Sequence, residues 1–351
     1  MRYLSVRTVV HHILDRGCLT RDEVVRDGVT ICDRSRRNTN LSVAARAGRG
    51  VFLKQARSWE GRDPSTLEHE ASFLALAARH CPDVVAEGAL ARCIDFDREN
   101  GVLATSLVQN AVDVRGLGDE AACARFEALG RLLARVHLAM QRAMRSHPRI
   151  GTHSRHEPWV LGLHRRPATD PGMTHGAREI RKWLLRFPEL AHLADDARAQ
   201  WRRETVVHGD VKTDNCLFPR AGTPPVAIVD WEMWGVGDPM WDVAGALQSV
   251  IVPAVLRHID GAGAQRVDET VFAPARVLAA SIWHGYAAAT NGADPGFADA
   301  RRAAVFTAGR LLQTAVEMTP SGAPGRDAAT LLQLAWNGLQ APDVLREHLI
   351  G

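Results

Sequence analysis

Lysine is almost absent from this chain. Only Lys54, Lys182 and Lys212 are lysines, so 40 of the 43 basic residues among its 351 residues are arginines. A lysine that persists against this background is a candidate for chemistry that needs a compact ammonium group instead of a planar guanidinium.

Several other features are missing, and each absence excludes a class of protein. The six cysteines have no Cys-x-x-Cys or other paired spacing, which argues against a zinc site and is typical of a reducing cytoplasm. The first residues contain no long apolar core, and no apolar run approaches about 18 residues, which argues against a signal peptide and a membrane span. The net charge of +3 gives no broad basic surface for nucleic acid. We therefore expect a cytoplasmic protein that binds neither membrane nor nucleic acid.

The composition is that of a soluble globular chain, with 46% hydrophobic and 24% charged residues, and its length can hold two core-forming units. The order of the expected elements predicts an α+β fold. We expect a helical lead-in over residues 1–34, a smaller lobe of sheet and helix over 35–109, and a larger, mainly helical lobe over 110–351.

Within the smaller lobe, residues 41–46 and 51–54 flank a glycine-containing turn and predict a β-hairpin that carries Lys54. Ser65, with Glu68 three residues later, forms a capping box that opens a helix running to about His80. The expected apolar face of this helix comprises Leu67, Ala71, Leu74 and Ala78.

Glu70 lies three residues after Leu67 and four before Leu74, so its carboxylate points from the apolar face. A carboxylate there needs a buried cation, and Lys54 on the preceding hairpin is the expected partner.

In the larger lobe, Asp119 to about Arg145 predicts a long helix, and the chain after Pro253 is mostly helical. Apolar residues recur at helical spacing along the long helix, at Leu129, Leu132, Leu133, Val136 and Met140.

The most informative stretch is His208–Asn215, with the spacing His-x-Asp-x-x-x-x-Asn, followed by Asp230 at the end of the apolar run 226–229. This spacing supplies one carboxylate for an attacking hydroxyl and two oxygen ligands for Mg²⁺, so it predicts phosphoryl transfer.

A series of landmarks along the chain resembles the aminoglycoside phosphotransferase and choline kinase group, a relative of the protein kinases, over about residues 35 to 290. The landmarks are Lys54, Glu70, Leu-Gly-Arg-Leu-Leu-Ala-Arg-Val-His at 129–137, the loop at 208–215, Asp230-Trp231-Glu232 and Gly-Asp-Pro-Met-Trp-Asp at 237–242. The resemblance implies a bilobal protein-kinase-like fold, with a small antiparallel-sheet N-lobe and a larger helical C-lobe. It also implies an enzyme that uses ATP and Mg²⁺.

The resemblance also implies a role for each matching residue. Asp210 positions the acceptor hydroxyl and takes its proton, which is the help that a weak nucleophile needs. Asn215 and Asp230 hold Mg²⁺, which prefers oxygen ligands. Lys54 contacts the α- and β-phosphates, and Glu70 orients it.

Two further residues are expected to support the site. His208 braces the loop through hydrogen bonds, and Asp242 holds the loop backbone from behind.

The phosphate-binding hairpin departs from the protein-kinase pattern, because no Gly-x-Gly-x-x-Gly precedes Lys54. Asn38 and Asn40 are candidates to cap phosphate oxygens. An ordinary Asn-rich turn explains them equally well. Arg36 and Arg37 either contact an anion or are solvated.

Lys212 bears on the acceptor. Lysine two positions after the catalytic Asp resembles Ser/Thr protein kinases, where it neutralises charge on the transferring phosphoryl group. Together with the lead-in before residue 35 and the segments 35–38, 52–55 and 214–217, Lys212 resembles the kinase subunits of class V lanthipeptide and thioamitide pathways. Those subunits phosphorylate Ser and Thr of a precursor peptide before a partner lyase eliminates the phosphate.

Two alternatives stay open. The first is an antibiotic or metabolite kinase with a small-molecule alcohol as acceptor. An aminoglycoside site needs carboxylates, and the candidates form no dense cluster; they are Asp260, Asp268, Glu269, Asp294, Asp299 and Glu317. The second alternative is a pseudokinase scaffold, which ranks third because every expected active-site residue is present.

Overall fold

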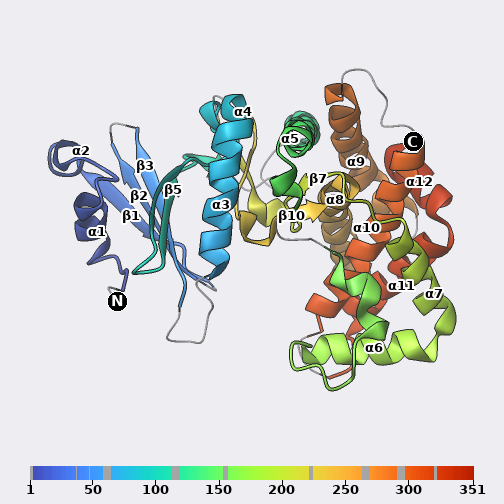
Figure 1. Ribbon diagram of the computed structural model, residues 1–351. Coiled ribbons are helices and arrows are strands. Elements are labelled where there is room, and N and C mark those ends of the chain that lie inside the picture. Colours follow the sequence, from blue (N-terminus) through green and yellow to red (C-terminus); the bar gives the residue numbers. More distant parts are fainter. Residues whose placement is uncertain are drawn as a thin grey trace. The chain divides into compact units, whose positions relative to one another are not determined.

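The structure is a computed structural model, and it describes residues 3–36, 38–46, 48–57, 65–112, 119–152, 157–220, 224–262, 269–290, 297–319 and 322–351. The chain divides into two compact units (Figure 1). Unit 1 comprises Met1–Leu117 and Asp214–Trp234, and unit 2 comprises Gly118–Thr213 and Gly235–Gly351.

The two units are not contiguous in sequence, whereas the predicted lobes were. Residues 214–234 group with unit 1 because their strands pair there: Pro219 pairs with Ala111, and the Ile228 N–H donates to the Ala89 carbonyl at 3.0 Å. The predicted lobe of residues 110–351 had placed this segment with the helices. The predicted boundaries at 35 and 110 themselves stay a prediction.

Unit 1 contains the sheet and a few helices. Its elements are α1 (Val9–Asp15), α2 (Arg21–Val25), β1 (Val29–Asp33), β2 (Thr39–Ala45), β3 (Gly50–Gln55), α3 (Ser65–His80), α4 (Pro82–Ala86), β4 (Cys93–Asp97), β5 (Val102–Ser106), β6 (Ala111–Val112), β8 (Cys216–Pro219), β9 (Ala227–Ile228) and the 3-10 helix η6 (Trp231–Met233). The main sheet has the order β1-β2-β3-β5-β4, and all its neighbouring strands are antiparallel. This sheet and the helices confirm the predicted α+β class.

The described part of the lead-in, residues 3–34, contributes to the core of unit 1. Val9 and Ile13 on α1 are fully buried and share one apolar cluster with Leu41 and Val43 of β2. The adjoining β1 pairs with β2 along its length. The N-terminal segment therefore covers one face of the sheet, and its removal would expose that face to water.

The opposite face of β3 carries Lys54, and α3 supplies Glu70 to it. Helix α3 buries Leu67 and Leu74 as predicted, but Ala78 is exposed and Phe73 is fully buried instead. The buried face of α3 is thus centred one residue earlier than we predicted, because Phe73 packs on the ring of Trp231, which follows β9 in the chain.

Unit 2 is almost entirely helical. Its elements are α5 (Asp119–Ser146), the 3-10 helices η3 (Pro148–Thr152) and η4 (Trp159–Arg165), α6 (His175–Arg186), α7 (Pro188–Ala199), β7 (Thr205–Val207), β10 (Gly235–Gly237), α8 (Pro239–Ala262), α9 (Glu269–Ala289), α10 (Phe297–Glu317), α11 (Arg326–Gln340) and α12 (Pro342–Ile350). The short helix η5 (Thr213–Asn215) contains the boundary between the two units.

Helices α5 and α9 approach closely at two glycines. A Cβ on Gly130 would lie 2.0 Å from the Ile282 carbonyl oxygen, and one on Gly285 would lie 1.9 Å from the Glu127 carbonyl oxygen. Any side chain at either position would push the helices apart. This contact explains the glycine in the 129–137 landmark.

One helix in the described part of the chain is long and apolar enough to cross a membrane. It is the Pro239–Arg257 part of α8, with a mean hydropathy of 1.3, and 83% of this window is buried inside the protein. The sequence analysis had predicted no apolar run of about this length.

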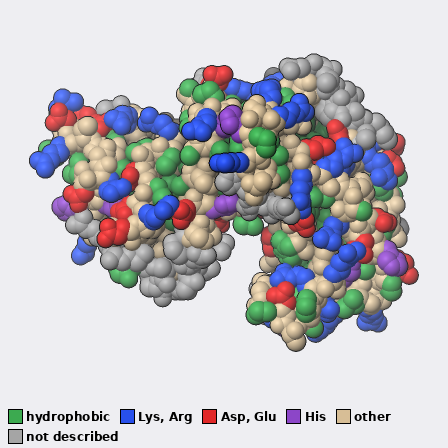
Figure 2. Space-filling model, in the orientation of Figure 1, with side chains coloured by type: hydrophobic (Ala, Val, Ile, Leu, Met, Phe, Trp, Pro, Cys, Tyr) green, Lys and Arg blue, Asp and Glu red, His purple; other side chains and the backbone are tan. Residues whose placement is uncertain are grey.

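On the face shown in Figure 2, basic and acidic side chains are interspersed, in keeping with the small net charge.

Candidate active site

Unit 1 brings together three of the predicted site residues, Lys54, Glu70 and Asp230. Lys54 Nζ donates to both carboxylate oxygens of Glu70, at 2.9 and 2.8 Å, and to Asp230 Oδ1 at 2.6 Å. The Lys54 and Glu70 side chains are 9% and 4% exposed, and that of Asp230 is 36% exposed. The ion pair predicted between β3 and α3 is therefore present, and the Asp230 carboxylate shares the same ammonium group.

Charge pairing keeps Lys54 protonated despite its burial. Burial by itself would lower the pKa of Lys54, but the charges of Glu70 and Asp230 outweigh it and raise the pKa above its usual value. The ammonium is thus a fixed positive charge at neutral pH. Such a charge can bind an anionic phosphate that enters beside Asp230.

Asp230 has an unusual backbone conformation, with φ 69° and ψ 56° in the left-handed region. A non-glycine residue rarely adopts it, and the surrounding packing must hold it there. The next residue supplies that packing, because the Trp231 ring is buried and stacks on Phe73 of α3, with centroids 3.7 Å apart and planes 7° apart.

A second contact joins α3 to this segment. His69 Nε2 donates to the Trp234 carbonyl at 2.8 Å, Trp234 Nε1 donates to the His69 carbonyl at 2.8 Å, and the two rings stack at 4.8 Å. The residues after Asp230 are thus held to the helix that carries Glu70. Sequence reasoning missed these contacts, because the partners of Trp231 and Trp234 lie far from them in the chain.

The remaining predicted residues of unit 1 lie on nearby strands and loops. Asn40 is directly opposite Lys54 in the β2–β3 register, and its Oδ1 atom is buried with no hydrogen-bond partner among the described residues. Asn215 is buried, and its carbonyl accepts a hydrogen bond from the Val229 N–H at 3.0 Å. Asn38 is half-buried, and its carbonyl accepts from the Arg36 N–H at 3.2 Å. Its role at a phosphate stays a prediction.

In unit 2, Asp242 on α8 holds the start of the 208–215 loop. Its fully buried carboxylate accepts from the His208 N–H at 2.6 Å and from the Gly209 N–H at 2.9 Å. His208 Nδ1 in turn accepts the Asp210 N–H at 3.2 Å. These are the contacts expected of a brace behind the loop.

The structure adds His137 and Tyr286 to this brace. His137 Nε2 lies 3.1 Å from Asp242 Oδ2, and His137 Nδ1 lies 3.2 Å from the Tyr286 hydroxyl. Burial by itself would raise the pKa of Asp242, but the hydrogen bond and charge of His137 outweigh it, so the pKa lies below its usual value. The brace is therefore an ionised carboxylate at neutral pH. His137 stands in the 129–137 landmark, which had carried no role.

Asp210 has a cation at each of its two carboxylate oxygens. Lys212 Nζ donates to Oδ2 at 2.6 Å, and Arg310 Nη2 on α10 donates to Oδ1 at 3.3 Å. The Lys212 contact lies within the loop, and Arg310 arrives from a helix far along the chain. Sequence reasoning missed Arg310, because one arginine among 40 in a helical segment carries no local pattern.

Helix α8 reaches the loop only because residue 245 has no side chain. A Cβ on Gly245 would lie 2.5 Å from the Val211 carbonyl oxygen. One turn later, Ser249 Oγ accepts the Thr213 N–H at 3.2 Å. Helix α8 thus holds the backbone on either side of Asp210, through Asp242 before it and Ser249 after it.

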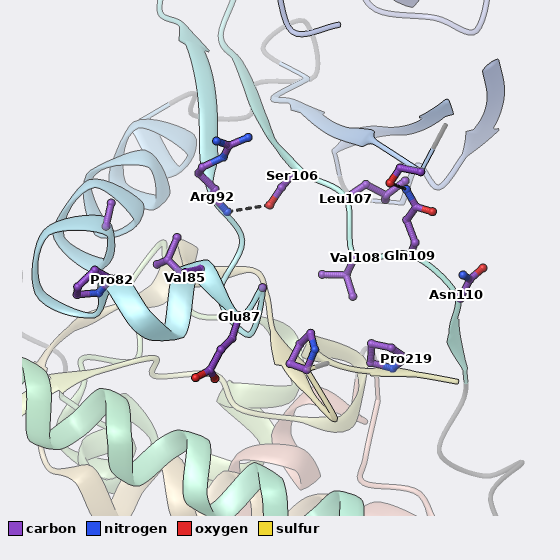
Figure 3. Close-up of a pocket in the computed structure, with 15 residues that line it drawn as sticks. Pro82, Val85, Glu87, Arg92, Ser106, Leu107, Val108, Gln109, Asn110 and Pro219 are labelled. Carbon is purple, nitrogen blue, oxygen red and sulfur yellow. Dashed lines mark hydrogen bonds between the residues drawn. The ribbon is translucent and has the colours of Figure 1, made fainter. Parts of the chain in front are cut away.

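A cavity of about 710 Å³ lies elsewhere in unit 1, lined by α4 and by the stretch Ser106–Asn110, where Ser106 Oγ accepts the Arg92 N–H at 2.9 Å (Figure 3). None of the described residues that line it is a predicted site residue. We therefore treat it as separate from the candidate active site.

The site residues of each unit suit the chemical groups that the sequence implied, namely ATP phosphate and Mg²⁺ for unit 1 and an acceptor hydroxyl for unit 2. Lys54 offers a cation to phosphate, Asn215 and Asp230 offer the oxygen donors that Mg²⁺ prefers, and Asn40 offers a buried amide that still needs a partner. Asp210 offers a carboxylate to a hydroxyl group.

Comparison with known proteins gives the class. A model of the phosphotransferase enzyme family matches residues 30–279, so the chain belongs to this family. The curated acyl-CoA dehydrogenase family member 10 of Mus musculus is 38% identical over 88 residues, which cover 22% of this chain and 8% of that protein. The match thus spans less than a tenth of that relative.

Two solved structures share the fold over nearly the whole chain. A putative aminoglycoside phosphotransferase from Ralstonia eutropha matches with a TM-score of 0.55 and 15% identity, covering 98% of this chain and 99% of that one. The amicoumacin kinase hAmiN matches with a TM-score of 0.56 and 13% identity, covering 97% and 96%. Membership of the phosphotransferase enzyme family agrees with the class of enzyme that the sequence predicted.

Proposed function

We propose that this kinase transfers the γ-phosphoryl group of Mg-ATP to a hydroxyl of a small-molecule alcohol that is neutral or anionic. The observation that carries the choice of acceptor is the pair of cations on Asp210, Lys212 at 2.6 Å and Arg310 at 3.3 Å.

Each residue has a defined part in the reaction. Asp210 takes the proton of the acceptor hydroxyl. The acceptor oxygen forms a bond to the γ-phosphorus, and the bond between the γ-phosphorus and the bridging oxygen breaks, so that ADP leaves. Lys54 binds the α- and β-phosphates. Asn215 and Asp230 would hold Mg²⁺, which neutralises phosphate charge when bound.

The charge around Asp210 disfavours a polycationic acceptor. The two cations and the carboxylate together carry a net positive charge, so a substrate ammonium beside Asp210 would meet repulsion instead of an unpaired carboxylate. Of the acidic residues considered above, Asp299 already pairs with Arg302 at 2.7 Å, and Glu317 accepts from Gln313 Nε2 at 2.8 Å. The side chains of Asp260, Asp268, Glu269 and Asp294 lie outside the described part of the chain. A neutral or anionic alcohol meets no such repulsion.

One solved structure with the same fold supports a small-molecule acceptor. The solved amicoumacin kinase is named with AMP-PNP, Ca²⁺ and Ami bound, and its fold is that of the present chain. The matched family is one of phosphotransferases, not of peptide-modifying enzymes by name.

A Ser or Thr hydroxyl of a precursor peptide is the second candidate acceptor. Lys212 favours it, since the ammonium lies beside the carboxylate that would meet the acceptor. In that case a partner lyase would remove the phosphate.

For either acceptor we place the enzyme in the cytoplasm, because none of its six cysteines, all of which are described, forms a disulfide in the structure.

Intact mass spectrometry after incubation with Mg-ATP tests the proposal. The panel contains neutral polyols, hydroxy acids, aminoglycosides and Ser/Thr-rich peptides. We expect a gain of about 80 Da, one phosphoryl group, on a neutral or anionic alcohol. A gain on an aminoglycoside alone would contradict the argument from charge, and a gain on a peptide alone would establish the second candidate.

A further inference from the structure

Arg310 on α10 holds three consecutive residues of the 208–215 loop. Its guanidinium donates to the Gly209 carbonyl at 3.4 Å, to Asp210 Oδ1 at 3.3 Å and to the Val211 carbonyl at 3.1 Å. The side chain is 5% exposed, and its guanidinium carbon lies 5.3 Å from the centre of the Trp241 ring. A planar fork with several donors suits this geometry, and a single ammonium group does not.

The two cations on Asp210 differ in how firmly they are held. The Lys212 side chain is 45% exposed and belongs to the loop itself, whereas Arg310 is buried and anchored by two backbone carbonyls and an aromatic ring. Arg310 is therefore the more firmly held of the two cations. An acceptor hydroxyl needs one carboxylate oxygen of Asp210.

We infer that Arg310 is a positioning residue for phosphoryl transfer: it fixes Asp210 through Oδ1, so that Oδ2 is the oxygen that receives the acceptor proton. This inference rests on the proposed role of Asp210. The sequence separation of 100 residues between Arg310 and Asp210 makes α10 a part of the active site that the loop motif does not reveal.

Arg310→Lys and Arg310→Ala test the inference, with Asp210→Asn as a reference and Arg302→Lys as a matched control. Arg302 also lies on α10 and is 2% exposed, but it pairs with Asp238 at 2.9 Å and Asp299 at 2.7 Å, away from the loop. It therefore reports the cost of changing a buried arginine on this helix without disturbing Asp210.

The first measurement is ADP formation from Mg-ATP, with water and with the panel alcohols as acceptors. We expect kcat to fall about tenfold in Arg310→Lys and about 100-fold in Arg310→Ala, because small displacements of reacting groups are this costly. KM for ATP stays within about twofold. Guanidinium ion at a non-denaturing concentration restores part of the activity of Arg310→Ala, and Arg302→Lys keeps the wild-type kcat.

The second measurement is amide hydrogen exchange over residues 209–213, which needs no acceptor and no turnover. We expect faster exchange there in Arg310→Ala than in Arg302→Lys. Wild-type kcat and exchange in Arg310→Ala, with Asp210→Asn inactive, would overturn the inference and leave the proposed function intact. Wild-type activity in Asp210→Asn would instead refute the role of Asp210. If no acceptor, water included, receives phosphate from the wild type, the proposed function fails and hydrogen exchange alone decides whether Arg310 orders the loop.

Discussion

Lys54→Met and Glu70→Gln each neutralise one residue of the Lys54–Glu70 ion pair, and we expect them to lower the free energy of unfolding of unit 1 by different amounts. Lys54→Met leaves the Glu70 carboxylate, 4% exposed, without its cation, and removing one partner of a buried pair costs about 3 to 5 kcal/mol. Glu70→Gln leaves Lys54 with Asp230 at 2.6 Å, so we expect a loss of about 1 to 2 kcal/mol. The 36% exposure of Asp230 keeps its own share of the Lys54→Met cost small, because water can solvate it.

The double variant separates this account from simple loss of contacts. In Lys54→Met with Glu70→Gln no buried charge is left unpaired, so we expect it to be more stable than Lys54→Met alone by about 1 to 2 kcal/mol. Urea denaturation followed by intrinsic fluorescence gives the unfolding free energies of the four proteins. Additive losses in the double variant would refute the reasoning, because they would show that Glu70 does not depend on Lys54.

Three other changes test the site and its support. Gly245→Ala should displace the Val211 carbonyl and lower kcat at least about tenfold. Gly325→Ala has open space around the new Cβ and should not lower kcat. Equal kcat values in the two variants would contradict the close approach of α8 to the loop. Burial raises the pKa of Asp238 from 3.8 to about 6, so the folded state binds this proton more tightly than the unfolded state does. The stability that this proton contributes to the folded state is fully present below about pH 3.8 and is lost as the pH rises through about 6. The unfolding free energy of the wild type relative to Asp238→Asn should therefore fall by about 2 to 3 kcal/mol between about pH 4 and about pH 7, and pH-independent values would refute it. Deleting residues 1–33 should abolish soluble expression, because α1 covers the sheet core, and a soluble truncated protein with wild-type melting would show that it does not.

Local patterns predicted the elements around the site well. The hairpin of β2 and β3, helix α3 and the long helix α5 follow from alternation, a capping box and helical spacing, each of which is written within one element. The Lys54–Glu70 pair also followed, because a carboxylate on an apolar helix face must meet a cation and lysines are scarce. The centre of the buried face of α3 could not be predicted from the sequence, because Phe73 is buried by Trp231, which lies in a distant segment.

Contacts between distant segments explain what the sequence left out. Arg310 reaches Asp210 across 100 residues, and nothing near Arg310 in the sequence distinguishes it from solvated arginines. The stacking of His69 on Trp234 and the bond from His137 to Asp242 likewise depend on tertiary packing. The grouping of residues 214–234 with the sheet depends on strand pairing that a linear division into lobes cannot show.

The central claim is that Asp210 serves the acceptor while Asp230 serves Mg-ATP. Isothermal titration of Mg-ATP into Asp210→Asn and Asp230→Asn, each paired with a transfer assay, tests it most directly. We expect Asp210→Asn to bind Mg-ATP within about threefold of the wild type and to transfer no phosphate, because it removes the base and no metal ligand. Asp230→Asn should lose most of its Mg-ATP affinity. Full transfer by Asp210→Asn, or undiminished Mg-ATP binding by Asp230→Asn, would contradict the account.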